Sequence, residues 1–330
     1  SRRVPVERRD FLKISAVSGA VVAGAAAGGW ALRRGQAVKV QETRLLMGTI
    51  INMTVLAESR KGGEAAVEAT LAEMARLVQL YDHRRADGPL GRLNREGRLA
   101  QAPAELVAVL TRALEYGEVS GGAFDITVKP VVEAYAEGKE PAALQGLVDY
   151  RKVKIAGDTV QFDEAGMQVT LDGIAKGTVV DGAVAKLGEL GYQQVLVEAG
   201  GDLRAGGAGQ RWRVAVDHPR QEVMEGFVAA FDLVEQSVAT SGDYMNSFSQ
   251  DRSSHHIVDP RLGVSPRKLA STTVVAPTAT DADALSTALM VLGVEAGLAL
   301  AEKLAGVEAL VVTKDLSVHR TKGFPRVQED

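Results

Sequence analysis

Alternating apolar and polar positions predict a series of β-strands along the chain. Residues 43–56 alternate and are rich in β-branched side chains, which is typical of a strand or hairpin. Residues 153–171 also alternate, with turn residues at 157–158 and 164–166, and we expect a hairpin whose alternation continues to residue 171. Shorter runs of the same kind predict strands at 194–197, 211–217, 226–233, 269–276 and 309–313.

Apolar residues at helical spacing predict the other elements. The predicted helices cover residues 61–81, 104–119, 179–190, 281–292 and 294–304, with a shorter one after a turn in 123–138. Polar stretches at 82–97, 237–244 and 254–263 are predicted loops. Strands interleaved with helices, without repeats or an internal linker, indicate a single mixed α/β (α+β) domain.

Composition and charge narrow the classes of function. The chain has no cysteine, which excludes disulfides, thiol nucleophiles and cysteine-ligated metals. Its net charge of −4 is unevenly distributed along the chain: residues 1–34 carry +5 and the remaining residues carry −9. An acidic body argues against nucleic acid as a partner.

The basic N-terminus resembles an export signal. The segment Arg8-Arg9-Asp10-Phe11-Leu12-Lys13 precedes a weakly apolar run over residues 14–32, the pattern of a twin-arginine signal for folded proteins. A run of this length would also just span a bilayer as a retained anchor. We therefore divide the chain into a signal or anchor, 1–35, and a domain, 36–330. We expect the twin-arginine machinery to export it to the periplasm or another extracytoplasmic site, with the N-terminal segment as a possible anchor in the inner membrane.

The stretch LDGIAKG at 171–177 stands between predicted strand and helix, where unpaired main-chain groups can bind an anion. Lys176 within it is either a phosphate partner or a cation between two elements. The chain contains neither a G-x-G-x-x-G in a strand-to-helix context nor a G-x-x-x-x-G-K-[ST].

Other residues have both a chemical and a structural interpretation. Asp283 and Thr287, four apart on a helix, suit Mg²⁺, but Thr280 with Asp283 would equally form a capping box. One histidine of the pair 255–256 is either a general base or a surface group. Asp125 either binds a ligand or caps a turn, and Met47 is either a ring contact or core.

The order of these motifs resembles the ApbE family, the FAD:protein FMN transferases. The matching segments are MGT at 47, RLN at 92, GGAFDITVKPVV at 121, LDGIAKG at 171, VEAGGDLRAGG at 197, ATSGDY at 239, HHIVDPRLG at 255 and DADALSTALMVLG at 281.

The resemblance implies a T-fold-like core with the flavin in a cleft. It also implies that FAD is the substrate and that its FMN half is joined to a threonine or serine of an acceptor protein, a membrane or periplasmic redox protein, with release of AMP. Two alternatives stay open: hydrolysis of FAD to FMN and AMP, and flavin binding without turnover.

Residue by residue, the resemblance places Mg²⁺, or Mn²⁺ in its place, on the Ala175 carbonyl, Asp283 and Thr287. His256 would be the base, with Asp283 and Lys176 as further catalytic residues. The flavin contacts would be Met47, Ala123, Phe124, Asp125, Lys176, Thr178, Asp181, His256 and Ile257.

Three segments depart from the family pattern. Residues 82–87 stand where a Ser/Thr-Tyr pair is common, so Arg84 or Tyr81 is expected to replace an aromatic contact. Asp172 replaces a usual glycine, and residues 131–132 are valines before Tyr135.

Overall fold

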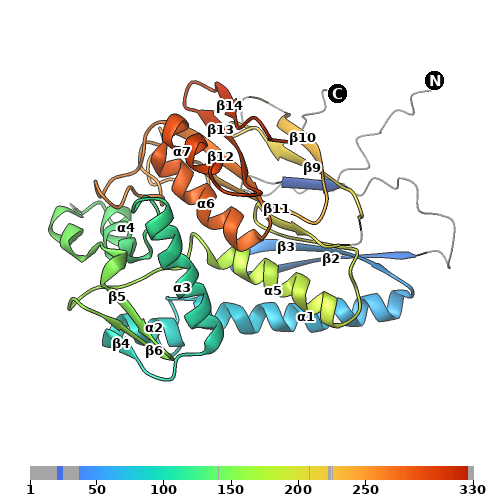
Figure 1. The fold of residues 1–330 in the computed structure, drawn as a ribbon, viewed down its shortest axis with the longest axis horizontal. Coiled ribbons are helices and arrows are strands. Elements are labelled where there is room, and N and C mark those ends of the chain that lie inside the picture. Colours follow the sequence, from blue (N-terminus) through green and yellow to red (C-terminus); the bar gives the residue numbers. More distant parts are fainter. Residues whose placement is uncertain are drawn as a thin grey trace.

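The computed structural model describes residues 21–24, 37–139, 141–207, 209–221, 224 and 226–325. An antiparallel eight-stranded sheet forms the centre, in the order β14-β13-β12-β11-β8-β7-β3-β2 (Figure 1). Its strands are β2 (Val38–Leu46), β3 (Thr49–Ala57), β7 (Val195–Ala199), β8 (Asp202–Ala205), β11 (Ser237–Gly242), β12 (Leu269–Ala276), β13 (Glu308–Thr313) and β14 (Val318–Arg320).

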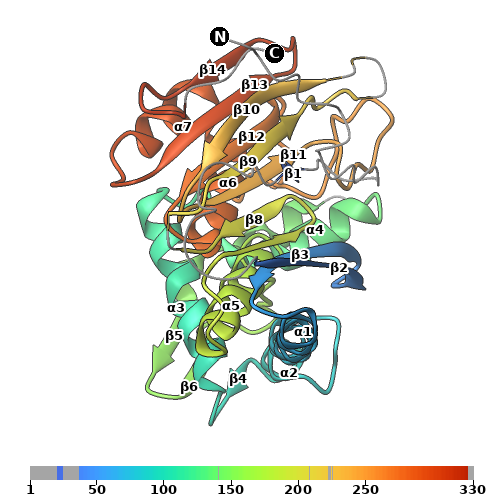
Figure 2. The same ribbon diagram turned by 90° about the vertical axis from the view of Figure 1, so that its right-hand side faces the viewer.

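Helices cover one face of this sheet. They are α1 (Arg60–Tyr81), α5 (Ala175–Glu189), α6 (Ala279–Leu292) and α7 (Val294–Ala301). α6 lies against α5, β11 and β12, and it is buried along most of its length (Figure 2). Its alanines leave little side-chain bulk, so polar groups on α6 come close to the start of α5.

A second sheet covers the opposite face. It has the order β1-β9-β10, from β1 (Val21–Gly24), β9 (Trp212–Asp217) and β10 (Phe227–Leu233). Successive residues of β13 point to opposite faces: Ala309 packs with the helices, whereas Leu310 packs with Trp212 and Phe231. The middle strands of the central sheet, such as β7, β11 and β12, are thus buried on both sides.

A smaller lobe extends from the helical face. It holds α2 (Pro89–Glu96), α3 (Ala104–Val119), α4 (Lys129–Ala136), the sheet β4-β6-β5 and three short 3₁₀ helices. The bounds are β4 (Arg98–Leu99), β5 (Val153–Ala156), β6 (Thr159–Phe162), and 3₁₀ helices Ile126–Val128, Pro141–Leu147 and Tyr150–Lys152.

Most predicted elements are confirmed, and three local interpretations were wrong. The loop predicted at 82–97 contains α2, because Pro89 at its first turn and Gly97 after its end delimit a short helix. The loop predicted at 237–244 contains β11, a central strand buried on both faces, which therefore does not alternate. The end of the expected hairpin, 167–171, belongs to no strand, because the backbone of Val169 bonds to the side chain of Asn94.

The predicted export segment lies mostly outside the described residues. Within it, Val21–Gly24 forms β1, which pairs antiparallel with β9. Among the helices that the structure describes, none has the length and apolar composition needed to span a bilayer.

Candidate functional site

The starts of α5 and α6 cap each other. The backbone N–H of Gly177 on α5 donates to Asp283 Oδ2 of α6, 3.0 Å away. In return, Asp181 on α5 accepts from the N–H groups of Ala279 and Thr280, each at 2.9 Å. Each helix therefore supplies a carboxylate to the unpaired amides at the start of the other. This pairing joins the LDGIAKG turn to the DADALST segment.

Glycine at position 177 is required by this close approach. A Cβ there would lie 2.5 Å from the carbonyl carbon of Ala279 and 2.8 Å from the nitrogen of Thr280. These are backbone atoms, which cannot move aside as a flexible side chain would.

The expected capping box at Thr280 and Asp283 was wrong. Thr278 is the N-cap of α6, and its hydroxyl accepts from the N–H of Asp281. Thr280 instead donates its hydroxyl proton to Asp181 Oδ2 at 2.6 Å. Asp283 is therefore not used to cap its own helix and faces α5.

A buried charge cluster surrounds Asp283. Lys176 Nζ lies 3.0 Å from Asp202 Oδ2, yet neither oxygen of Asp202 receives an aligned hydrogen bond. Burial raises the pKa of Asp202, and the Asp283 carboxylate raises it further. Burial also raises the pKa of Asp283, against the opposing effect of Lys176. Burial would lower the pKa of Lys176, but Asp202 and Asp283 outweigh it and raise the pKa, so Lys176 is protonated.

The oxygen donors at this place suit a hard divalent cation. When Asp202, Asp283 and Lys176 are all ionised, the cluster has a net charge of −1, which one further positive charge would balance. The Thr287 hydroxyl lies 3.4 Å from that of Ser241, and a Cβ on Gly173 would lie 3.2 Å from Thr287 Oγ1. Ala175 is the first residue of α5.

These carboxylate, hydroxyl and carbonyl oxygens are of the type that Mg²⁺ takes, completed by waters and phosphates. Within the described part of the chain, no three His, Cys, Asp or Glu side chains gather closely enough to hold a metal by themselves.

His256 lies near the same turn. Burial lowers the pKa of His256 to about 4, with further lowering from His255 and a smaller effect of the Lys176 charge. Its ring Nδ1 is buried without a hydrogen-bond partner, while its backbone N–H donates to the Asn246 carbonyl at 3.0 Å. At neutral pH the ring is therefore uncharged.

The apolar residues predicted to contact flavin lie in three places. Phe124 is buried, and a Cβ on Gly173 would meet its ring at 3.2 Å, so it lies beside the central turn. Ala123 and Ile257 share one buried cluster. Met47 forms the β2–β3 turn with a positive φ of 58°, which a residue other than glycine adopts only at a cost.

Three polar residues on the predicted flavin list are already bonded within the protein. Asp125 accepts from the Thr127 N–H and hydroxyl through Oδ1 and from the Tyr150 N–H through Oδ2, so it acts as a cap. Asp181 accepts hydrogen bonds from the first amides of α6 and from Arg204 Nη1, the latter at 2.5 Å. The hydroxyl of Thr178 donates to the Ile174 carbonyl within the same helix turn.

A family model described as the ApbE family matches residues 47–311. The chain belongs to the ApbE family. The FAD:protein FMN transferase of Treponema pallidum is 32% identical over 326 residues, covering 88% of this chain and 89% of that protein. The enzyme of the same name from Haemophilus influenzae is 32% identical over 275 residues, covering 76% and 78%.

Solved structures of the ApbE family have the same architecture. The Thermotoga maritima ApbE protein matches with a TM-score of 0.78 at 26% identity, covering 87% of this chain and 98% of that one. The Pseudomonas stutzeri flavinyl transferase ApbE matches with a TM-score of 0.77 at 29% identity, covering 89% and 97%. The resemblance and the single mixed α/β domain expected from the sequence are confirmed.

Two of the departures from the ApbE pattern contact each other. Asp172 in the central turn accepts from Arg84 at 3.0 Å and lies 3.4 Å from the ring of His83. Burial would raise the pKa of Asp172, but His83 and Arg84 outweigh it and lower the pKa. Tyr81 is a core residue, 5% exposed, so of the two expected substitutes for the aromatic contact only Arg84 reaches the turn.

Sequence reasoning did not single out Asp202 and Glu198, which stand in the segment VEAGGDLRAGG. Glu198 accepts from Asn52 at 2.6 Å and from the Gly201 N–H at 3.0 Å, and this fixes the turn that presents Asp202. Acidic residues in two mostly apolar strands were the available signal, because charged side chains are rarely buried unless they have a partner.

Proposed function

We propose that this chain transfers the FMN half of FAD to a threonine or serine hydroxyl of an acceptor protein, releases AMP, and depends on Mg²⁺ or Mn²⁺. The chain is a transferase of the ApbE family. The observation that carries the finer proposal is the charge cluster of Lys176, Asp202 and Asp283 between two helix starts.

Asp283, Thr287 and the Ala175 carbonyl would hold the metal. When bound, the ion would neutralise charge on the pyrophosphate and orient it for in-line displacement. Gly177 holds the Asp283 carboxylate in place through its N–H. Protonated Lys176, fixed by Asp202, supplies a positive charge to the phosphate that leaves with AMP.

His256 is the proposed base. Its uncharged ring would accept the acceptor hydroxyl proton at Nδ1 as the new P–O bond forms and the bond to AMP breaks. Burial around the ring favours the uncharged form. Exclusion of water from the phosphorus would favour transfer over hydrolysis.

We further propose that the protein works outside the cytoplasm and serves a membrane or periplasmic redox protein. The support is the twin-arginine pattern at residues 8–13. Cell fractionation with and without Arg8→Lys and Arg9→Lys tests this. Equal distribution of both forms would reject export by this route.

The decisive experiment incubates the full chain with FAD, Mg²⁺ and an acceptor domain, followed by a denaturing gel under ultraviolet light and detection of AMP. The expected result is a fluorescent acceptor band with AMP release, both lost with EDTA and reduced on the order of 10²-fold or more in Asp283→Asn. The control Asp281→Asn changes a carboxylate two residues earlier in the same helix, which pairs with Arg112 instead. AMP without a fluorescent band would indicate a hydrolase, and bound FAD without AMP would indicate a binding protein.

A further inference from the structure

The loop between β11 and β12 carries His256 but has little regular structure. Its backbone pairing consists of two isolated bridges, Ser247 with His255 and Asp259 with Val264. Single backbone bonds such as that from the Phe248 N–H to the Ser254 carbonyl, at 2.7 Å, hold parts of it, and side-chain contacts add further restraint.

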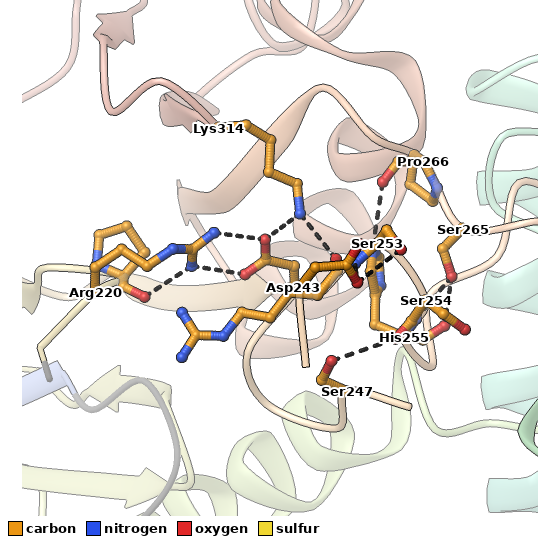
Figure 3. A network of polar contacts seen from close by, with 12 residues as sticks. Arg220, Asp243, Ser247, Ser253, Ser254, His255, Ser265, Pro266 and Lys314 are labelled. Carbon is orange, nitrogen blue, oxygen red and sulfur yellow. Dashed lines mark hydrogen bonds and ion pairs between the residues drawn. The ribbon is translucent and has the colours of Figure 1, made fainter. Parts of the chain in front are cut away.

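Asp243, the first residue of the loop, is held by two cations. Its carboxylate is fully buried and accepts both Arg220 Nη1 and Nη2 at 2.8 Å. The ammonium of Lys314, which follows β13, contacts Asp243 Oδ2 as well (Figure 3). A bidentate guanidinium would already pair this carboxylate, so Lys314 is not needed for neutrality.

Lys314 makes a second bond inside the loop. Its Nζ donates to the backbone carbonyl of Arg252 at 2.9 Å. One ammonium thus connects the start of the loop to a point four positions before His256. The backbone of Lys314 is fixed by a hydrogen bond from its N–H to the Lys268 carbonyl at 3.1 Å.

The histidine end of the loop is held separately. The N–H of His255 donates to Ser265 Oγ at 2.9 Å, and its ring Nε2 lies 3.2 Å from the Pro266 carbonyl (Figure 3). Between this anchor and Lys314, His256 has its backbone fixed while ring Nδ1 stays without a partner.

We infer that Lys314 is a positioning residue that sets the place of His256 by tying Asp243 to the Arg252 carbonyl. This inference rests on the proposed role of His256 as the base. Small displacements of a catalytic group reduce turnover strongly, by up to about 10²-fold for roughly 1 Å. Lys314 touches neither the turn at 171–177 nor Asp283 in any described contact, so FAD binding should be unaffected.

The test compares Lys314→Met, Lys314→Arg and His256→Ala in the full chain, using the transfer assay and FAD binding by fluorescence. Lys314→Met removes the tie but leaves Arg220 on Asp243, so no buried charge is left unpaired. Lys186→Met is the matched control, because its side chain is 33% exposed against 27% for Lys314 and pairs with the surface residue Glu189.

We expect kcat of Lys314→Met to fall by about 10-fold or more, with KM and Kd for FAD within about 2-fold, and Lys314→Arg to recover part of the loss. The double variant with His256→Ala should be no slower than His256→Ala alone, since residues that act as a unit are not additive. If Lys314→Met proves poorly folded, Lys314→Leu, which likewise has no donor for Asp243 or the Arg252 carbonyl, takes its place.

Unchanged kcat in Lys314→Met, or losses that add to those of His256→Ala, would overturn the inference while leaving the base role intact. Full turnover in His256→Ala would overturn both the base role and this inference.

Discussion

The peptide backbone of Gly177 lies directly against that of Ala279. A Cβ at position 177 would lie 2.5 Å from the carbonyl carbon of Ala279 and still closer to its oxygen. The starts of α5 and α6 therefore touch through main-chain atoms, and the absence of a side chain at 177 allows the Gly177 N–H to reach Asp283.

Gly177→Ala should reduce the free energy of unfolding by about 1–3 kcal/mol or more, because the added methyl group meets backbone that cannot move aside. Gly188→Ala is a control in the same helix with no atom within 4 Å of its added Cβ. It should instead stabilise by about 0.5–1 kcal/mol. Urea unfolding of both variants checks this, and equal effects would contradict the close approach.

Asp283→Asn should leave the metal-free protein as stable as the parent, or more stable. Burial raises the pKa of Asp283, so removal of its charge relieves a cost, and the amide oxygen still accepts from Gly177. The same variant should lose the rise in melting temperature that Mg²⁺ produces in the parent. Thermal melts with Mg²⁺ or EDTA measure both effects, and an undiminished Mg²⁺ effect would remove Asp283 from the metal site.

The acid limb of kcat/KM should lie near pH 4, well below the ordinary histidine value of 6.5, because burial lowers the pKa of His256. Because its pKa is lower in the folded chain than in the unfolded one, His256 makes its full contribution to the free energy of unfolding above pH 6.5. That contribution declines as pH falls from 6.5 through 4, where the unfolded chain binds the proton more readily. Rate profiles of the parent and His256→Ala test the first part, and a limb at pH 6.5 would contradict it.

Arg84→Ala should weaken FAD affinity by several-fold, as expected for loss of a guanidinium stacked on a ring, about 1 kcal/mol. Stability should change by less than about 1 kcal/mol, since the Arg84–Asp172 pair is exposed, at 66% and 52%. Arg85→Ala, which loses the exposed pair with Asp87, is the control. Equal FAD affinity in both variants would show that Arg84 does not replace the aromatic contact.

The sequence predicted elements whose periodicity comes from a single buried face. The α1 and α3 helices lie where the pattern placed them. β11 was missed because its residues are buried on both faces, which removes the alternation on which a strand prediction depends. Segment 167–171 was predicted as part of a strand because its apolar and polar residues alternate, although the backbone of Val169 bonds to the side chain of Asn94.

At the site, residue types alone left each role ambiguous, and long-range contacts separate the roles. Asp181 and Asp283 are both acidic residues in a helix, but Asp181 has its oxygens taken by amides, a hydroxyl and Arg204. The spacing between Asp283 and Thr280 suggested a cap, but Thr278 performs that function. Asp202 joins the cluster only through the sheet pairing of β8 with β7 and β11, which no local pattern encodes.

The mutual capping of α5 and α6 has the form of a local two-fold relation. In each helix, the carboxylate that caps the other helix lies four positions after the amide that the other helix caps. Asp181 lies four positions after Gly177, and Asp283 lies four positions after Ala279. One residue inserted between either pair would rotate its carboxylate by about 100° around the helix and break the cap of the other helix too. Two short segments 106 positions apart in the chain are therefore bound to a common spacing, and changes in length are confined to the connections between them.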